Sequence, residues 1–283
     1  MNVYEMVTER IIEQLESGII PWQRPWTGTR DGAYNRVTCN SYSILNQMLL
    51  QHRGEYATFK QWLEAGGHIK KGAKAEMVVF WKIQQVKEEQ EDGTEVIKKI
   101  PVLRYYNVFH ISQVEGVEPK EKPDLQEQEP IVEAEELKKM YMDREKIEIN
   151  ETISNQAFYS PTLDYIQVPC KEQYKNVEEF YSTLFHEMVH STGHMRRLNR
   201  IEAGARTGFG SETYSKEELV AEIGAAMTLN RLGIETEKTF KNSSAYIQNW
   251  LQVLKNDNKF VVSAASRAEK AVRYIWGEND LQE

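Results

Sequence analysis

The sequence predicts an α+β protein built from two parts. In the first part, apolar residues recur at helical spacing near the N-terminus, and two runs rich in β-branched and aromatic residues follow between residues 77 and 111. In the second part, short strand-like segments precede a stretch of helical patterns that begins after Asn176. We therefore expect helices plus a β-hairpin in the first part, and a small sheet plus helices in the second.

Helices open the first part. The first helix stops at Gly18, because glycine favours a helix C-terminus, and Pro21 prevents its continuation. A second helix is expected over Ile44–His52, and a third follows Thr58 as N-cap and ends before Gly66. The apolar stripe of the first helix consists of Val3, Met6, Val7, Ile11 and Leu15.

A long β-hairpin and a linker follow. The segments Met77–Val86 and Val96–Ile111 have strand composition, and Asp92-Gly93 between them favours a turn. The next segment, 116–136, holds three of the eight prolines, no aromatic residue and an acidic excess, so it buries too little apolar surface to order itself. We interpret it as a linker between domains 1–115 and 137–283; a loop draped over one domain is the alternative.

The second part begins with a helix and continues with strands. The first helix is expected over Ala134–Arg144. The strands that follow are expected at Lys146–Ile149, Ala157–Tyr159 and Asp164–Val168. The later helices are expected at Val177–Thr192, Ser215–Leu232, Ser244–Lys255 and Val261–Trp276.

Composition excludes several classes of protein. With 40% hydrophobic and 28% charged residues the chain is an ordinary globular protein, and no run of about 18 apolar residues predicts a membrane span. The N-terminus lacks a signal-peptide pattern, and Cys39 and Cys170 make no disulfide scaffold, so we expect a cytoplasmic protein. Residues 1–115 hold 14 basic and 14 acidic residues, so the net charge of −8 lies in the rest. A globally basic nucleic-acid binder is excluded; a local basic patch is not.

The pentapeptide HEMVH (186–190) is the strongest signal for chemistry. An HExxH match has a chance expectation of roughly 0.02 in this composition. Asn176 as N-cap and Gly193 as C-terminal stop place the motif on one helix, so the imidazoles of His186 and His190 share a face and can bind one metal. Glu187 can then act as general base toward a water whose pKa the metal lowers. Two histidines without a metal are the alternative.

The third metal ligand must come from elsewhere in the chain. His194 does not fit the pattern HExxHxxGxxH, because Arg196 stands where that pattern has its last histidine. Glu218 and Glu222 lie on a later helix, four residues apart, and this spacing is similar to that of gluzincin-type sites. The similarity implies Glu218 as ligand and Glu222 as the group that orients a ligand histidine. Alternatively, Ser215 and Glu218 form a capping box, and Glu222 is the ligand.

Other features near the motif have two interpretations each. Segment 158–169 is either a plain strand or the edge strand that aligns an extended peptide. Tyr214 is either a packed tyrosine or a hydrogen-bond donor to a developing oxyanion. Glu217 is expected to be solvated, and the basic run 194–200 is a solvated loop or contacts an acidic partner. Zn²⁺ is the expected metal, although two histidines and one carboxylate also accept other divalent ions.

Aromatic residues alternate with cations in the first part. Rings stack on unpaired bases while guanidinium groups follow phosphates, so this composition suits single-stranded nucleic acid; core packing of the rings is the alternative. Trp81, Lys82, Arg104 and Tyr106 on the hairpin could extend the surface. The candidate DNA-binding residues are Trp22, Arg24, Trp26, Arg30, Tyr34 and Arg36, with a basic cluster of Lys70, Lys71 and Lys74.

Several motifs in order resemble a known family. YEMVTERIIEQLESGIIPWQRPW, TFKQWLEAGGHIKKGAKAEMVVFWK and RYYNVFHISQVEG resemble the N-terminal domain of ArdC-type antirestriction proteins, which also heads related primases of conjugative plasmids. FHEMVHSTGHMRRLNR and YSKEELVAEIGAAM resemble the zincin-type metallopeptidase domain of the same family. The resemblance spans nearly the whole chain and implies a protein of a mobile element or phage that binds single-stranded DNA and protects it from restriction enzymes.

Three functions stay open at this point. The first is an antirestriction protein that binds single-stranded DNA and hydrolyses peptide bonds in a restriction enzyme or another protein. The second is a DNA-binding protector or restriction-enzyme inhibitor whose metal site is structural or inactive. The third is an intracellular peptidase unrelated to DNA. The sequence leaves the oligomeric state open.

Overall fold

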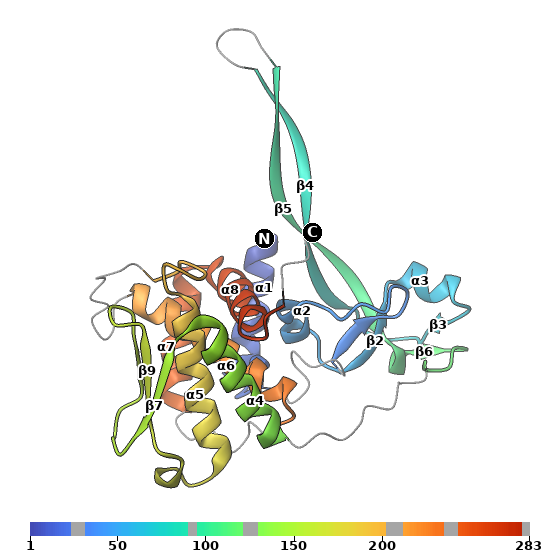
Figure 1. Ribbon diagram of the computed structural model, residues 1–283. Helices are drawn as coiled ribbons and strands as arrows, with labels where there is room; N and C mark the ends of the chain where they lie inside the picture. Colours follow the sequence, from blue (N-terminus) through green and yellow to red (C-terminus); the bar gives the residue numbers. More distant parts are fainter. Residues whose placement is uncertain (24–31, 90–94, 121–129, 202–211, 235–242, 279–283) are drawn as a thin grey trace.

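The computed structural model describes residues 1–23, 32–89, 95–120, 130–201, 212–234 and 243–278. It has the predicted α+β architecture (Figure 1). The first part contains α1 (Val3–Glu16), η1 (Pro21–Gln23), β1 (Ala33–Asn35), α2 (Ile44–Leu49), β2 (Gly54–Ala57), α3 (Phe59–Glu64), β3 (His68–Ile69), β4 (Glu76–Glu89), β5 (Glu95–His110), η2 (Ile111–Gln113) and β6 (Val114–Glu115). The second part contains α4 (Pro130–Glu145), β7 (Glu148–Thr152), β8 (Phe158–Ser160), β9 (Tyr165–Pro169), η3 (Lys171–Gln173), α5 (Val177–Thr192), α6 (Glu212–Arg231), α7 (Ser243–Asn256) and α8 (Phe260–Ile275).

The predicted hairpin forms the largest part of the first sheet. Its strands β4 and β5 pair antiparallel along their whole length and extend as an arm beyond the other elements (Figure 1). β2 pairs antiparallel with the end of β5, and β1 pairs parallel with β2, which gives the order β1-β2-β5-β4. A separate two-stranded sheet joins β3 to β6. The expected turn at Asp92-Gly93 lies outside the described residues.

The second part contains the small sheet and the helices that the sequence predicts. Its sheet has the order β7-β9-β8, with β7 parallel and β8 antiparallel to β9. The helix α5 packs against this sheet on one side and against α6 and α8 on the other. Apolar residues of α5 at helical spacing, such as Phe180, Leu184 and Met188, are buried in this arrangement.

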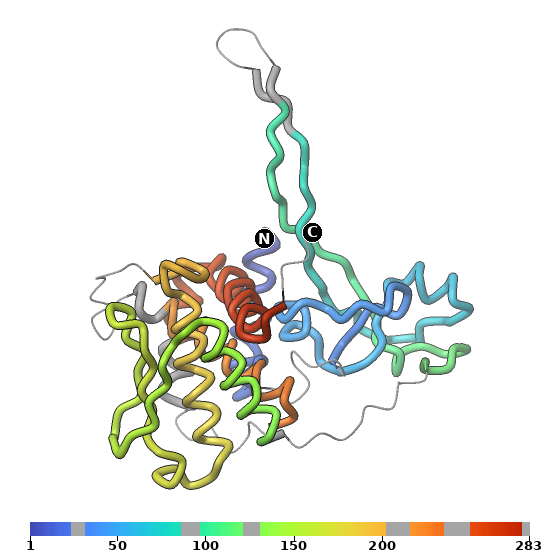
Figure 2. Tube along the Cα trace, viewed as in Figure 1, coloured from blue at the N-terminus to red at the C-terminus, as the bar shows by residue number. Residues whose placement is uncertain are grey.

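One hydrophobic core joins the two parts of the chain. Val7 and Ile11 of α1 are fully buried in the same cluster as Val261 and Ala265 of α8. The hydroxyl of Thr8 donates to the carbonyl of Asn258 at 2.7 Å. Figure 2 shows the blue N-terminal helix beside the orange and red C-terminal helices. Helix α1 therefore packs on elements that the sequence assigns to the second domain.

Some predicted boundaries are wrong. Helix α4 begins at Pro130, so the end of the expected linker 116–136 is helical, and Ala134 within it is fully buried. Helix α2 ends at Leu49 rather than His52, because Leu50 turns to an extended conformation and packs in a second buried cluster with Tyr56. Among the described residues, no helix is long and apolar enough to cross a membrane.

Candidate metal centre

Helix α5 places the two histidines on one face. The side chain of Asn176 accepts a hydrogen bond from the backbone of Glu179 at 2.8 Å and fixes the start of the helix. His186 and His190 follow four residues apart, and their ring centroids are 4.7 Å apart. Their Nε2 atoms lie 3.1 Å from each other, so both point toward one place.

Glu218 of α6 completes a cluster of three donors. Its Oε2 lies 3.4 Å from Nε2 of His186, and its Oε1 lies 3.3 Å from Nε2 of His190. One ligand atom from each of the three residues fits within a span of 4.8 Å. Two imidazole nitrogens and one carboxylate oxygen are a donor set that divalent transition metals bind. The three side chains therefore fit a divalent metal ion.

Two more carboxylates lie on the far side of the histidine rings. Oε1 of Glu222 is 3.8 Å from Nδ1 of His186, and Oε1 of Glu217 is 3.7 Å from Nδ1 of His190. Glu222 thus lies on the side of His186 where the similarity to gluzincin-type sites implies an orienting group. The expectation that Glu217 is solvated is wrong, because this carboxylate is largely covered and pairs with Arg200 at 2.8 Å.

The capping-box alternative for Glu218 is wrong in this structure. Helix α6 begins at Glu212, so Ser215 lies inside the helix and is not its N-cap. Glu218 is free to face α5 and does so. Tyr214 lies in the first turn of α6, and its side chain is outside the described part of the structure.

A glycine allows α6 to approach α5 closely at the motif. A Cβ atom on Gly224 would lie 2.7 Å and 3.1 Å from the two methyl groups of Val189, which is inside the HEMVH sequence. Real Cβ atoms essentially never come as near as 2.7 Å, so any other residue at position 224 would force Val189 or the helices to shift. Because Gly224 and Glu218 lie on the same helix, this contact sets how near Glu218 comes to the histidines.

Electrostatics hold the cluster together before a metal binds. Burial alone lowers the pKa of His190, but the carboxylates of Glu217 and Glu218 outweigh it and raise this pKa to about 10. Burial likewise opposes protonation of His186, and Glu218 raises the pKa of that imidazole. Burial raises the pKa of Glu218, but the two histidines hold it well below its ordinary value. Metal binding must therefore displace protons from the imidazoles.

Glu187 lies beside the cluster and is not used in holding the fold. It follows His186 on α5, and only 8% of its surface is exposed. Its carboxylate makes no ion pair or hydrogen bond within the residues that the structure describes. The charge of Glu187 acts on the imidazoles of both His186 and His190 and helps to raise their pKa values, which places this carboxylate at the centre.

Two neighbouring segments of the chain, 158–169 and 194–200, can now be placed in the fold. Of segment 158–169, β8 is an edge strand, whereas β9 is central and cannot pair with another chain. The run 194–200 is solvated only in part, because Met195 and Arg196 are exposed. The guanidinium of Arg197 is buried between Asp164 and Glu145. Arg200 also points inward, to Glu217 and to the carbonyl of Val189.

Several DNA-binding candidates have structural roles. The ring of Trp22 is fully buried and packs edge-on against Trp250 with 5.1 Å between centroids, so it cannot stack on a base. Arg36 pairs with Glu55 and lies over the ring of Trp62. Tyr34 lies beside Glu55, and burial together with that carboxylate raises the pKa of its phenol to about 12.

The basic cluster of Lys70, Lys71 and Lys74 uses one of its ammonium groups for a hydrogen bond within the protein. The ammonium of Lys70 donates to the carbonyl of Ser112 at 2.8 Å, whereas Lys71 and Lys74 are exposed. The remaining candidates, Arg24, Trp26 and Arg30, lie outside the described residues.

Comparisons with known proteins cover both parts of the chain. The model of the N-terminal domain of anti-restriction factor ArdC matches residues 1–109, and a zincin-like metallopeptidase model matches residues 135–267. Two DNA primases named TraC from Escherichia coli are 31% identical over 96% of this chain, which spans only 27% and 20% of their lengths. Protein y4eC of Sinorhizobium fredii is 31% identical over 97% of this chain and 91% of its own length.

Two solved structures match almost completely. They are crystal structures of the antirestriction protein ArdC from plasmid R388. The Mn(II)-bound form has a TM-score of 0.76 and 29% identity over 100% of both chains. The metal-free form has a TM-score of 0.74 and 32% identity over 98% of both chains. The chain therefore belongs to the ArdC family of antirestriction proteins, with an ArdC N-terminal domain followed by a zincin-like metallopeptidase domain.

Proposed function

We propose that this protein counteracts restriction through a metal-dependent peptidase centre. His186, His190 and Glu218 bind a divalent cation, which when present supplies a Lewis acid for a peptide carbonyl and an acidified water. Glu187 accepts the proton of the attacking water on its carboxylate and returns it to the leaving amine nitrogen. The observation that carries this proposal is the convergence of three donors from two helices, with the carboxylate of Glu187 acting on both imidazoles.

Zinc is the metal that we propose first. Two imidazoles and one carboxylate with open positions are typical of catalytic zinc in peptidases. The same donors also bind manganese, and one solved structure of a related ArdC protein holds Mn(II). The edge strand β8 is the position at which we place an extended peptide substrate, because an unpaired strand edge offers backbone hydrogen bonds.

We further propose that the first part of the chain binds single-stranded DNA in the cytoplasm. This proposal rests on the match to the ArdC N-terminal domain and on relatives that are primases, since a primase acts on a single strand. The DNA-binding part then brings the peptidase centre to incoming DNA, where a restriction enzyme or another DNA-bound protein is its substrate.

Glu187→Gln tests whether hydrolysis is the mechanism. The amide keeps the size of the side chain and leaves the three metal donors in place, but it cannot take up a proton. We expect metal content to stay at the wild-type level, and peptide cleavage to fall about 10²- to 10⁴-fold, the range for loss of a general base. Protection of incoming DNA in cells should fall with it. Glu178→Gln on the same helix is the control and should change neither.

The opposite result has a specific meaning. If Glu187→Gln protects DNA as well as wild type, the peptidase mechanism is wrong. Protection then comes from covering the DNA or occupying the restriction enzyme, and the metal centre is structural. His186→Ala then tests whether protection needs the metal centre at all. This variant removes a metal donor and leaves the hairpin untouched.

A further inference from the structure

The register of the hairpin divides it into two faces. Residues directly opposite each other on paired strands lie on the same face, and successive residues of one strand lie on opposite faces. The pairs Phe80–Arg104 and Val78–Tyr106 share one face with Lys82, which we call the outer face. The pairs Val79–Tyr105 and Trp81–Leu103 share the other, which we call the inner face.

The inner face packs against the body of the protein near its base, where Trp81 and Tyr105 stay about half exposed. Val79 and Leu103 are buried in the main core of the molecule. The ring of Trp81 meets Tyr4 of α1 edge-on, with 6.3 Å between ring centroids. This face attaches the arm to the body of the protein.

The outer face buries Val78 in a second apolar cluster, and its other residues carry aromatic rings and cations at the surface. The side chain of Tyr106 is 56% exposed, and its ring stacks on Phe80 with centroids 4.7 Å apart and planes only 5° from parallel. Arg104, directly opposite Phe80, and the adjacent Lys82 are both exposed. Neither cation has an ion-pair partner within the described residues. The residue pairs from Val78–Tyr106 to Gln84–Ile100 contain no acidic side chain.

Packing gives no reason for this arrangement. Exposed aromatic surface is unfavourable in water, and unpaired cations add nothing to the stability of a two-stranded arm. Flat rings beside cations suit a ligand that offers flat faces and negative charges in alternation. Unpaired bases with their phosphates have this chemistry, whereas the bases of a duplex are stacked on each other and closed to the rings.

We propose that single-stranded DNA binds along the outer face of the hairpin, with bases on Tyr106 and Phe80 and phosphates on Arg104 and Lys82. This rests on the proposed function, since it names the surface by which the first part holds DNA. These four residues take the place of Trp22 and Arg36 as candidate DNA contacts, because Trp22 is buried and Arg36 pairs with Glu55.

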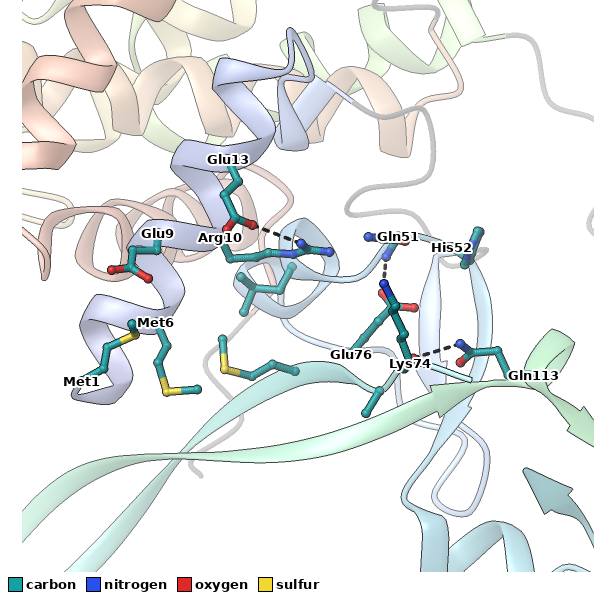
Figure 3. A pocket seen from close by; sticks show the side chains of 13 residues that line it. Met1, Met6, Glu9, Arg10, Glu13, Gln51, His52, Lys74, Glu76 and Gln113 are labelled. Atoms are coloured by element: carbon teal, nitrogen blue, oxygen red, sulfur yellow. Dashed lines mark hydrogen bonds and ion pairs between the residues drawn. The ribbon is translucent and has the colours of Figure 1, made fainter. Parts of the chain in front are cut away.

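The pocket at the base of the hairpin is a poorer site for a polynucleotide. This cavity of about 540 Å³ lies between α1 and the start of β4 (Figure 3). Lys74 and Arg10 line it, but so do Glu9, Glu13 and Glu76. Arg10 is paired with Glu13 at 3.3 Å (Figure 3). Three carboxylates at the wall repel a phosphate chain.

The test compares the two faces of the same hairpin in the full-length protein. Binding of a fluorescently labelled oligothymidylate is measured by anisotropy at several salt concentrations. Tyr106→Ala should weaken binding roughly tenfold or more, as loss of one base-stacking ring does. Lys82→Ala should make the salt dependence shallower by about 0.7 in the logarithmic slope, the value for one phosphate contact on a single strand. The matched controls are Tyr105→Ala and Lys99→Ala on the inner face, which should leave both quantities unchanged.

Further variants and competitors distinguish a wrong surface from a protein that does not bind DNA. Tyr106→Phe keeps the ring and should bind as wild type, and thermal melting checks that each variant folds. If wild type binds and the outer-face variants bind equally well, the surface is wrong and the proposed DNA function stands. Equal losses on both faces, or equal competition by duplex DNA, also overturn the proposal. If wild type does not bind the oligonucleotide even at low salt, the DNA part of the proposed function fails.

Discussion

Each histidine of the proposed metal centre has a carboxylate next to the ring nitrogen that faces away from the other donors. Glu222 takes this place at His186, and Glu217 takes it at His190. A carboxylate there fixes which nitrogen carries the hydrogen and which is free to bind a metal. Arg200 holds Glu217 in turn, and its guanidinium also donates to Thr192 and to the carbonyl of Val189.

Glu217→Gln should therefore weaken metal binding although Glu217 is not a donor. The amide is neutral, so His190 loses the partner that orients its ring. We expect the dissociation constant for Zn²⁺ to rise about 10- to 100-fold, the range for loss of an orienting partner. Competition with a chromogenic chelator measures this constant. Glu172→Gln, an exposed site outside the centre, is the control, and an unchanged constant for Glu217→Gln would contradict the assigned role.

The residues of the centre differ in how far the sequence predicts them. His186, Glu187 and His190 follow from spacing on one helix, and Glu218 follows from the similarity to gluzincin-type sites, with Glu222 as the alternative. Glu217 and Arg200 could not be predicted, because their pairing depends on how the chain turns after α5. That turn places Asn199 in the left-handed region, with a φ of 49°, and brings residues 197–201 back under the helix end.

At the scale of elements, the crossing of α5 and α6 decides the geometry of the centre. Two donors come from one helix and the third from the other, so a shift of the crossing separates them. The crossing depends on Gly224, where the helix backbone meets the side chain of Val189.

Gly224→Ala tests this crossing. The added methyl group overlaps a buried β-branched side chain, which costs about 1–3 kcal/mol of overpacking. The better helix propensity of alanine offsets about 0.5–1 kcal/mol of this loss in the free energy of unfolding. We expect a net loss in the free energy of unfolding, measured by urea denaturation, together with weaker metal binding.

A second substitution gives the matched control for the crossing. Val189→Ala removes the methyl groups that Gly224→Ala would strike, so the double variant should lose less stability than the sum of the single variants. Strict additivity of the two losses would show that the contact does not limit the helix crossing.

Element types could be predicted where the pattern is long. The fourteen-residue helix α1, the hairpin and the helix α5 all appear close to their expected limits, since their apolar periods extend over many residues. The strands β1 and β2 were not predicted, because three- and four-residue segments carry too little pattern and their parallel pairing joins distant residues. The prediction that Trp22 binds DNA is wrong, because its burial depends on Trp250, more than two hundred residues away in the chain.

At the scale of the whole molecule, a shared hydrophobic core connects the two parts. The sequence shows a linker and so predicts two domains, but a composition pattern cannot show that α1 packs across onto α7 and α8. In the sequence, Val7 and Ile11 indicate only the apolar stripe of an ordinary amphipathic helix. Their partners, such as Val261, lie at the other end of the chain.

Ile11→Ala should destabilise the metal centre as well as the N-terminal part. The side chain is fully buried, so its truncation leaves a cavity that costs about 2–5 kcal/mol. If the core is shared, that loss reaches α8, which packs against both α5 and α6. We expect thermal unfolding followed by circular dichroism and release of bound Zn²⁺ to shift together to a lower temperature. Ile83→Ala on the exposed arm is the control and should shift neither. Zinc release that stays at its wild-type temperature in Ile11→Ala would show two independent domains, and α1 would then be only a surface attachment.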